Sequence, residues 1–478
     1  MWAQRAQQMW LVKGDRNTRY FHTLVNYRRN KATFKTIQDE DQNWIQDPFL
    51  IKEAAKKYFI DLYTSNSSMD SDQRKVVVTN SGIPILNEEQ IQHLTKPFTK
   101  FEIETALFQI KGSKAPGPDG MPPIFFQQFW DTVGADITGM VASFLNRGRL
   151  LRTFNQTNVV LIPKIDNPVN FKDYRPISLC NTTYKIISKT LTNRLQPIMK
   201  NLILPFQNAF VKDRSIHDNI ILAKEVLHYI NGCKNRKQVW AALKVDLHKA
   251  YDKISWNFLE EVITHMRFPV HWRKLIMECI STSTLRIKIN GDYSNWFNPK
   301  AGLRQGDPLS PYLFVLCTNV LSSFLVRAEQ LKLIQGPKIG RQVLPLNHLI
   351  IFGQASGLFL NKDKSEIKLS PNASANQKNH LLSIINCKGI DSLGKYLGAF
   401  IDGPNPDTQN AELIIDHLQQ KLSGWKASML SQAVRLTLIQ AVLSAIPLYT
   451  LHFTSLTDKY AKKCQKLKVE WVSVVSKV

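Results

Sequence analysis

Two kinds of hydrophobic pattern alternate along the middle of the chain. Short apolar runs at Asn158 to Pro163 and at Trp240 to Leu247 predict buried strands. The spacing of a helix face recurs in Leu259, Val262, Ile263 and Met266. The segment Gly302 to Leu316 passes into a helix that is apolar on every side, which predicts that this helix is buried. The most apolar stretch, Pro311 to Val326, is too short, and holds too many polar residues, to predict a membrane span. These patterns predict a mixed α/β body that reaches to about residue 340.

The two ends of the chain have different patterns. Residues 1 to about 65 interleave aromatic and basic side chains. This fits either base stacking with phosphate neutralisation, or a segment that packs its aromatic side chains on the next domain. A polar linker is predicted at Ser65 to Asp72, a helix over Glu88 to Gly112, and a loop at Lys111 to Pro123, which holds four prolines and three glycines. Two amphipathic stripes predict a helical region at the end of the chain: Ala411, Ile414, Ile415, Leu418 and Leu422, then Val434, Leu438, Ala441, Val442 and Ala445.

Charge narrows the class of partner. The 62 Lys and Arg residues exceed the 38 Asp and Glu residues, which gives a formal net charge of +24. A chain of this kind favours polyanions. The basic residues are spread along the whole sequence instead of forming one amphipathic face. We therefore expect the binding partner to be a nucleic acid and not an anionic membrane.

Cysteine usage points to a reducing compartment. The six cysteines are far apart and form no C-x-x-C pair, which predicts reduced core residues at Cys180, Cys233, Cys279, Cys317, Cys387 and Cys464. Met1 to Gly14 has no apolar signal-peptide core. An intracellular protein is therefore expected, in either the nucleus or the cytoplasm.

One carboxylate is well placed for chemistry. Asp246 ends an apolar strand-like run and precedes Tyr251 by five positions. A carboxylate at a strand end can hold a hard divalent cation through oxygen, but the same position also suits a turn or cap residue. Asp252 and Ser255 precede a helical stripe, so both are interpreted as helix-start residues.

Two further segments carry candidate binding groups. Gly302 to Leu316 passes from a glycine- and proline-rich loop into the apolar helix. Its start offers Arg304, Gln305 and the backbone near Gly306 to a sugar or phosphate, unless it is simply a capped core helix. Two cations, Lys164 and Arg175, lie near a predicted strand. They could neutralise a triphosphate or merely be solvated.

Eight segments form one ordered set that covers almost the whole chain: W-L-V-K-G-D-R-N-T-R-Y-F-H (10–22), K-A-P-G-P-D-G (114–120), Y-R-P-I-S-L (174–179), K-V-D-L-H-K-A-Y-D (244–252), G-L-R-Q-G-D-P-L-S-P-Y-L-F (302–314), S-G-L-F-L-N-K-D-K-S (356–365), K-Y-L-G (395–398) and L-S-Q-A-V-R-L-T-L-I-Q (430–440). Together they resemble the reverse transcriptase of non-LTR (LINE-type) retrotransposons, especially the plant lineage. The resemblance implies an RNA-directed DNA polymerase that binds an RNA template, a DNA primer and, if active, deoxynucleoside triphosphates. It implies no membrane partner and does not determine the oligomeric state.

The resemblance also implies a fold and its division into regions. It is a right-hand polymerase fold of the α/β (α+β) class, with fingers, palm and helical thumb, and with a palm sheet that is expected to be incomplete here. Residues 1–65 would be a basic linker region following an absent endonuclease, and residues 66–150 an N-terminal extension of the reverse transcriptase. Fingers and palm would occupy residues 151–410, and a thumb-like helical region residues 411–478.

Roles for the central residues follow from the same resemblance. Asp246 corresponds to a catalytic, metal-binding aspartate, and Tyr251 to the steric gate against a ribose 2′-hydroxyl. Gln305 and Gly306 would line the nucleotide and template pocket. Such polymerases use two Mg²⁺ ions, which need several carboxylates on a rigid sheet.

The remaining roles concern the triphosphate and the primer. Lys164 and Arg175 would face the incoming triphosphate, and Lys364 corresponds to the lysine proposed to protonate the leaving pyrophosphate. Tyr396, Leu397 and Gly398 would form the primer grip.

The chain departs from the family at one point. Between the strand-like match at Val343 to Leu349 and the match that begins at Gln354, relatives carry a strand-turn-strand hairpin with a paired aspartate box. Here four residues stand between those matches, and no Asp-Asp dipeptide occurs anywhere in the 478 residues. We therefore expect the partner aspartates of Asp246 to be absent, Mg²⁺ not to bind productively, and this degenerate copy to be inactive. The strand before Asp246 should lack its usual partner, which predicts a rearranged or poorly folded palm.

Two alternatives to a degenerate copy stay open. The missing piece could have been skipped as a false intron, so that an active reverse transcriptase is concealed by a mis-spliced gene model. The chain could instead be a domesticated RNA-binding or scaffold protein that keeps the basic groove without catalysis.

Overall fold

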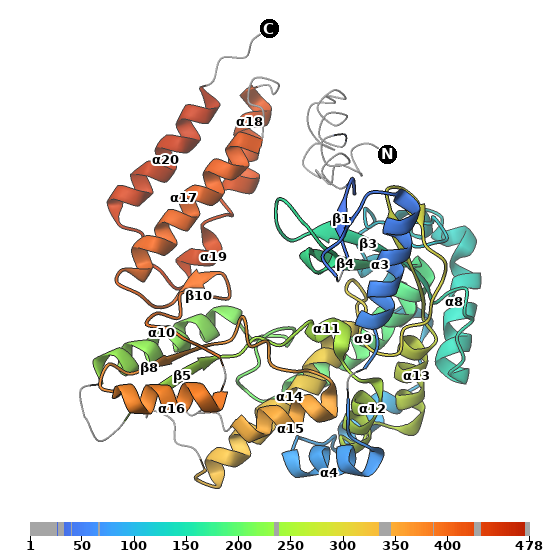
Figure 1. Ribbon diagram of the computed structural model, residues 1–478. Helices are drawn as coiled ribbons and strands as arrows, with labels where there is room; N and C mark the ends of the chain where they lie inside the picture. Colours follow the sequence, from blue (N-terminus) through green and yellow to red (C-terminus); the bar gives the residue numbers. More distant parts are fainter. Residues whose placement is uncertain are drawn as a thin grey trace.

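The computed structural model describes residues 26, 33–39, 41–65, 67–233, 239–333, 346–385, 387–424 and 432–473. Strands and helices alternate through the middle of the chain and helices close it, which confirms the mixed α/β class (Figure 1). In the aromatic and basic segment, residues 1–25, 27–32 and 40 lie outside the described residues. Phe34 is described; it is buried and stacks on Tyr174 at 4.7 Å between ring centroids, so for this side chain the packing alternative is correct.

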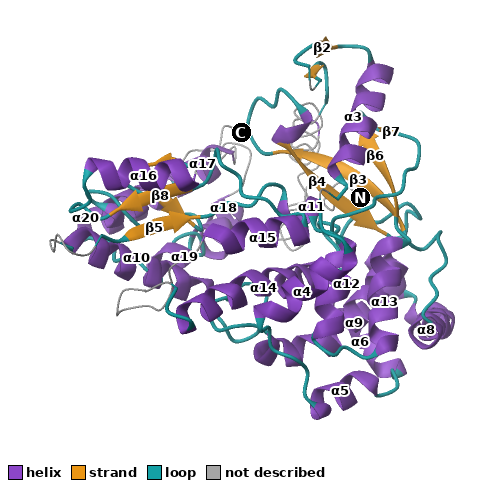
Figure 2. Ribbon diagram, turned by 60° about the horizontal axis from the view of Figure 1, so that its bottom comes forward, coloured by secondary structure: helices purple, strands orange, loops and turns teal. Residues whose placement is uncertain are grey.

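A four-stranded sheet forms the upper right part of the molecule in Figure 2. Its strands run in the order β4 (Tyr174–Cys180), β3 (Gln156–Pro163), β6 (Thr284–Ile289) and β7 (Asp292–Tyr293). The central strand β3 pairs antiparallel with β4 and parallel with β6, which confirms the strand predicted at Asn158 to Pro163.

One face of this sheet is sealed by a helix. The inward residues of β3 and β6 pack in one cluster with α3 (Pro48–Leu62), because side chains in a strand alternate between its two faces. The small hairpin of β1 (Ile37–Gln38) and β2 (Trp44–Ile45) precedes α3, and the short helix η2 (Phe171–Asp173) leads into β4.

The largest core is helical and lies below this sheet. It joins α4 (Ser71–Ser81), α5 (Glu88–Thr95), α6 (Lys100–Gln109), α7 (Pro123–Gln128), α8 (Trp130–Arg147), α9 (Thr182–Leu202), α12 (Trp256–His265), α13 (Val270–Ser281), α14 (Ser310–Gln330) and α15 (Leu346–Ser356). The predicted stripe of Leu259, Val262, Ile263 and Met266 is fully buried in it, as a helix face should be.

Two segments near the start of the chain differ from the prediction. The expected helix over Glu88 to Gly112 is two helices, because Pro97 cannot continue a helix and Thr99 starts the second one with a capping box to Glu102. The expected linker at Ser65 to Asp72 ends early. Asp70 caps α4, whose first residue is Ser71.

The apolar helix α14 is longer than the apolar run that predicted it. By length and composition alone its 21 residues could cross a membrane, so the prediction that this stretch is too short was wrong. Half of its most apolar window is nevertheless buried inside the protein, where α14 packs against α4, α12 and α15. It is a core helix in this structure.

A three-stranded sheet with order β5 (Ala241–Lys244), β8 (Glu366–Leu369) and β9 (Lys388–Gly389) lies on the other side of the molecule (Figure 2). Helices α10 (Ile216–Gly232) and α16 (Ala375–Ile385) lie beside it. Strand β5 is shorter than predicted and only half-buried, so the run at Trp240 to Leu247 is not a fully buried strand.

The region of the missing hairpin is helical where it is described. Leu346 to Leu349 belong to α15, so the strand-like interpretation of Val343 to Leu349 is wrong for these four residues; residues 343–345 lie outside the described part. After α15, Gly357 turns the chain with a positive φ of 78°, and Leu360 then pairs with Leu247. Strand β5 therefore has a partner, since β8 pairs antiparallel along all four of its residues.

Helices close the chain. The hairpin of β10 (Lys395–Tyr396) and β11 (Ala399–Phe400) leads to α17 (Pro406–Gly424), α18 (Gln432–Leu438), the π-helical turn Ile439–Leu443, α19 (Leu448–Leu451) and α20 (Asp458–Val472). Their apolar faces form a separate cluster that includes Ile414, Ile415, Leu418 and Leu438. In Figure 1 these helices rise from the three-stranded sheet, on the side away from α3. All six cysteines are free thiols, and four of them are buried. Cys233 and Cys387 are only half-buried, so the prediction of core residues was wrong for these two.

Candidate nucleotide and nucleic-acid cleft

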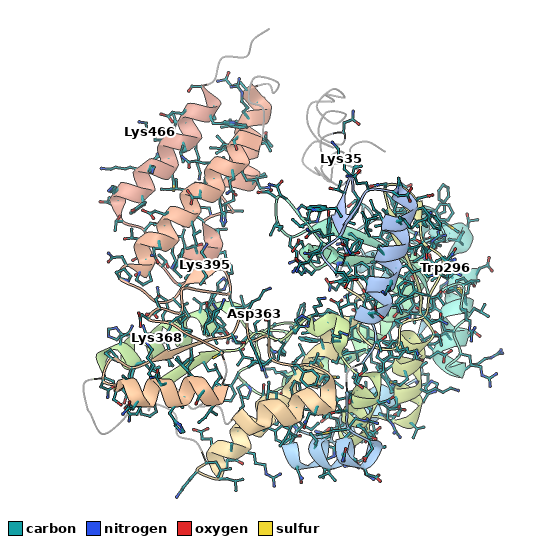
Figure 3. All side chains as sticks on the ribbon, viewed as in Figure 1. Lys35, Trp296, Asp363, Lys368, Lys395 and Lys466 are labelled. Carbon is teal, nitrogen blue, oxygen red and sulfur yellow. The ribbon has the colours of Figure 1, made fainter. Side chains whose placement is uncertain are left out.

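A cleft of about 880 Å³ is bordered by α3, the ends of β3 and β4, the segment after β5 and the loop before α14. Nine of the residues singled out from the sequence line it: Lys164, Arg175, Asp246, Tyr251, Asp252, Arg304, Gln305, Gly306 and Lys364. Figure 3 shows Asp363, the neighbour of Lys364, near the centre of the molecule, between Lys368 of β8 and the helical core. The structure thus brings together segments that are up to 200 positions apart (364 − 164) in the sequence.

Asp246 is held where β5 ends. Its backbone N–H donates to Ser365 Oγ at 3.1 Å, and its carbonyl accepts from the Asn361 N–H at 2.8 Å. One carboxylate oxygen, Oδ2, accepts from Asn361 Nδ2 at 3.0 Å. Sequence reasoning missed Asn361, although its place just before the Lys362 to Lys364 turn of the same motif could have drawn attention to it.

Asp252 was interpreted as a helix-start residue, and this was wrong. It lies in the short helix α11 (Ala250–Lys253), lines the cleft, and is only 6% exposed. Its Oδ1 accepts a hydrogen bond from Gln305 Nε2 at 3.0 Å. Ser255 does start a helix, since its Oγ accepts from the Phe258 N–H at the N-terminus of α12.

Burial dominates the electrostatics of Asp252. It raises the pKa of this carboxyl to about 6, although the hydrogen bond from Gln305 and the charges of Lys249, Lys164 and Lys253 act in the opposite direction. Burial also lowers the pKa of Lys164 and Lys253. The cleft therefore combines several cations with one deeply buried carboxylate.

Tyr251 is fixed by an aromatic stack. Its ring lies 4.6 Å from the ring of Phe314 at an interplanar angle of 19°, and its carbonyl accepts from the Leu303 N–H at 2.7 Å. Burial raises the pKa of the Tyr251 hydroxyl to about 12, so the hydroxyl stays protonated near neutral pH.

Close backbone approach explains two glycines in the loop before α14. Gly302 has φ 86°, and a Cβ there would lie 2.5 Å from the carbonyl oxygen of Asp252. Gly306 has φ 120°, and a Cβ would lie 2.9 Å from the carbonyl oxygen of Ser178. The loop is tied to β4 by the Ser178 N–H, which donates to the Gln305 carbonyl at 2.8 Å. Any larger residue at these glycines would move Gln305.

Contrary to the prediction, Arg304 does not offer its charge to a ligand. Its side chain is buried, it donates to Asn155 Oδ1 at 2.6 Å and to the Cys279 carbonyl at 2.9 Å, and it stacks over Tyr184. At the start of α14, Asp307 accepts from the Leu309 N–H and from Ser310 Oγ. The core alternative is therefore correct for Arg304, whereas Gln305 and Gly306 line the cleft, and binding of a ligand by these two residues stays a prediction.

The remaining predicted cations line the cleft differently. Lys164 follows β3 and donates to the Lys172 carbonyl at 2.9 Å, while Arg175 is exposed on β4, opposite Ile162. Lys364 is exposed in the turn before β8. These positions leave Arg175 and Lys364 accessible to an anionic ligand.

Tyr396, Leu397 and Gly398 are not among the residues that line the cleft. They form the turn between β10 and β11, where Leu397 and Gly398 have positive φ values of 49° and 86°. Tyr449 of α19 donates its hydroxyl to the Leu397 carbonyl at 2.6 Å, so the C-terminal helices hold this turn in place.

The donor set of the cleft does not fit a pair of divalent cations. Two such ions need several converging carboxylates. In the part of the chain that the structure describes, no group of three His, Cys, Asp or Glu residues is arranged to hold a metal. Asp246 is bonded to Asn361, and the buried Asp252 is bonded to Gln305. This arrangement of carboxylates supports no reaction step through a metal pair.

Comparison with known proteins defines the class of this cleft. Residues 162–335 match the family model described as reverse transcriptase (RNA-dependent DNA polymerase). This range contains most of the cleft residues, from Lys164 to Pro311. This part of the chain is therefore similar to reverse transcriptase domains, and the mixed helices and partial sheets are consistent with the polymerase fold of that class.

Relatives add a second, more particular level. A 149 kDa transposon TX1 protein of Xenopus laevis, itself uncharacterized, is 24% identical and aligns with 98% of this chain and 37% of its own length. A Pol polyprotein from the type-1 retrotransposable element R2 of Nasonia vitripennis is 22% identical, over 62% of this chain and 29% of its own length. The domain is therefore similar to those of non-LTR retrotransposon proteins.

The plant lineage stays a prediction. The two long relatives come from animals, whereas an uncharacterized mitochondrial protein of Arabidopsis thaliana is 44% identical over only 68 residues, or 14% of this chain. The chain spans about a third of the length of the long relatives.

Proposed function

We propose that this polypeptide of the RNA-directed DNA polymerase family holds a primed RNA template and a deoxynucleoside triphosphate in its cleft, but does not join the nucleotide to the primer. The net charge of +24 and the accessible Arg175 and Lys364 support binding of a polyanion. The stacked Tyr251 beside Gln305 supports a nucleotide pocket.

The observation that carries the proposed inactivity is the carboxylate set. Phosphoryl transfer by two metal ions needs carboxylates that converge on both ions. Asp246 lies at the end of β5, next to a sheet whose other described strands are β8 and β9. The full sequence contains no Asp-Asp dipeptide that could serve as its partner.

A primer-extension assay tests the inactivity. Purified chain is given a primed RNA template, the four dNTPs and Mg²⁺ or Mn²⁺, with Asp246→Asn as the matched control for contaminating polymerases. No extension is expected from either protein. Extension by the wild-type chain that the Asp246→Asn variant lacks would overturn the proposal.

Binding is tested separately by fluorescence anisotropy with the same primed RNA. Affinity should fall steeply with salt, by about a thousandfold between 50 and 200 mM if six or more phosphates are contacted. The double variant Arg175→Ala, Lys364→Ala should bind more weakly. The control, Lys52→Ala, removes a cation that pairs with Asp292 and does not line the cleft. Equal affinity of both variants would contradict a role for the cleft.

The genomic interval between the codons for Leu349 and Gln354 decides the main alternative. An in-frame aspartate hairpin there would favour an active enzyme concealed by the gene model, and the same extension assay on the restored chain would show it. For the chain as it stands, the proposal expects binding of RNA without extension of the primer. It also expects the protein in the nucleus or the cytoplasm.

A further inference from the structure

The side chain of Asp252 makes a contact that the fold does not need for its own assembly. The segment around α11 is already joined to the loop before α14 by backbone bonds: the Gly302 N–H donates to the Ile254 carbonyl at 2.8 Å, and the Leu303 N–H to the Tyr251 carbonyl at 2.7 Å. The indole of Trp256 adds a third bond, to the Gly302 carbonyl at 2.8 Å. The Asp252 carboxylate reaches beyond this junction, to the side-chain amide of Gln305.

That contact decides which end of the amide faces the cleft. An ionised carboxylate only accepts hydrogen bonds, so the NH₂ group of Gln305 must face Asp252. The carbonyl oxygen is at the opposite side of the planar amide, and Gln305 lines the cleft. Without the carboxylate, either end of the amide could face a ligand.

We propose that Asp252 is a positioning residue, which holds Gln305 with its carbonyl oxygen toward the cleft and so selects ligands that present a hydrogen-bond donor there. The donor would be a sugar hydroxyl or a base N–H group of a bound nucleotide. This inference rests on the proposed function, because it concerns the nucleotide held in the same cleft.

The charge of Asp252 makes the selection depend on pH. Burial raises its pKa to about 6, so the carboxylate form predominates at pH 8 and the neutral form at pH 5. A neutral carboxyl group can donate as well as accept hydrogen bonds, so the side-chain amide of Gln305 can rotate by 180° and still be bonded to Asp252. The charged or titratable groups that surround it are Lys249 and Lys253 on its own segment, Lys164 at the end of β3, and Tyr63 after α3.

The test measures a ratio of affinities instead of an affinity. Wild-type chain is loaded with primed RNA, and nucleotides displace a fluorescent dNTP. The sugar arm compares dGTP with dideoxy-GTP, which lacks the 3′-hydroxyl, and the base arm compares dGTP with dITP, which lacks the 2-amino group. We expect one of the two arms to show discrimination of about tenfold at pH 8, which falls to less than about twofold at pH 5.

Variants separate positioning from a general structural role. Asp252→Asn keeps the shape but presents either a donor or an acceptor to Gln305, so it should lose the discrimination at every pH. Asp61→Asn removes one negative charge from exposed Asp61 on α3 and should leave the ratio and its pH profile unchanged. In a Gln305→Ala background, Asp252→Asn should have no further effect on the ratio.

The outcomes distinguish this inference from the proposed function. Wild-type chain that binds no primed RNA or nucleotide would overturn both. Binding with a ratio that is the same in wild type and Asp252→Asn, or one that does not change with pH, would overturn the role of Asp252 alone. Circular dichroism spectra that match the wild type would show that the variants are folded.

Discussion

Replacing the buried Asp252 carboxyl with the amide of asparagine should stabilise the fold at neutral pH. The side chain is 6% exposed, and burial raises its pKa from 3.8 to about 6. This difference of about 2 units (6 − 3.8), at about 1.4 kcal/mol per unit, corresponds to about 3 kcal/mol against the charged form. Asparagine keeps an acceptor oxygen for Gln305 and removes the buried charge.

The sign of the pH dependence follows from proton linkage. The folded-state pKa lies above the unfolded value, so the stability associated with this group is fully present below about pH 4 and is lost as the pH rises through about 6. Asp252→Asn should therefore match the wild type near pH 4 and exceed its free energy of unfolding by about 3 kcal/mol at pH 8.

Urea unfolding at pH 4, 6 and 8, followed by circular dichroism, measures this difference. Asp61→Asn provides the matched control, since it removes an exposed carboxylate from the neighbouring helix α3 and should change stability by less than about 0.5 kcal/mol. An Asp252→Asn variant that is less stable than the wild type at pH 8, or equally shifted at all three pH values, would refute the reasoning.

Three further perturbations test other parts of the fold. Asp402 pairs with Lys368 at 2.7 Å, and Asp402→Leu would leave this buried lysine without its counter-charge. Urea unfolding should then show a free energy of unfolding that is lower by about 3–5 kcal/mol, and a smaller decrease would contradict a buried ion pair. Gly302→Ala should cost more than about 2 kcal/mol because its Cβ would lie 2.5 Å from a carbonyl oxygen, whereas Gly82→Ala, also at positive φ but with nothing within 4 Å, should cost about 1 kcal/mol in the same assay. Tyr449→Phe removes the bond to the β10–β11 turn and should speed amide hydrogen exchange in that turn about fivefold; unchanged exchange would show that the bond does not hold it.

Ordered motifs in the sequence identified most of the cleft. Lys164 directly follows the strand-like run Asn158 to Pro163, Asp246 lies near the end of the run Trp240 to Leu247, and Gln305 lies in the loop before an apolar helix. Residues at the ends of such elements are the ones that a fold brings to a common edge, and the structure places all three on one cleft. Their proposed roles stay predictions.

The same motifs could not predict which charged side chains are buried or which way these side chains point. Asp252 and Arg304 both border the cleft, yet the first is buried against Gln305 and the second directs its charge to the core. A local pattern gives the element and its rough position, but the partner of a buried charge comes from a segment far away in the sequence. Pro97 shows a different cause of error: it divides an apolar periodicity that by itself predicts one continuous helix.

Strand β5 has a further consequence for handling the protein. Among the described strands it pairs only with β8, and it ends the order of its sheet. An outer strand with free amide and carbonyl groups can recruit a strand from another molecule. Concentrated preparations of this chain should therefore self-associate through β5. A proline at one of the four positions of β5 should reduce this self-association and leave the distant helical core intact.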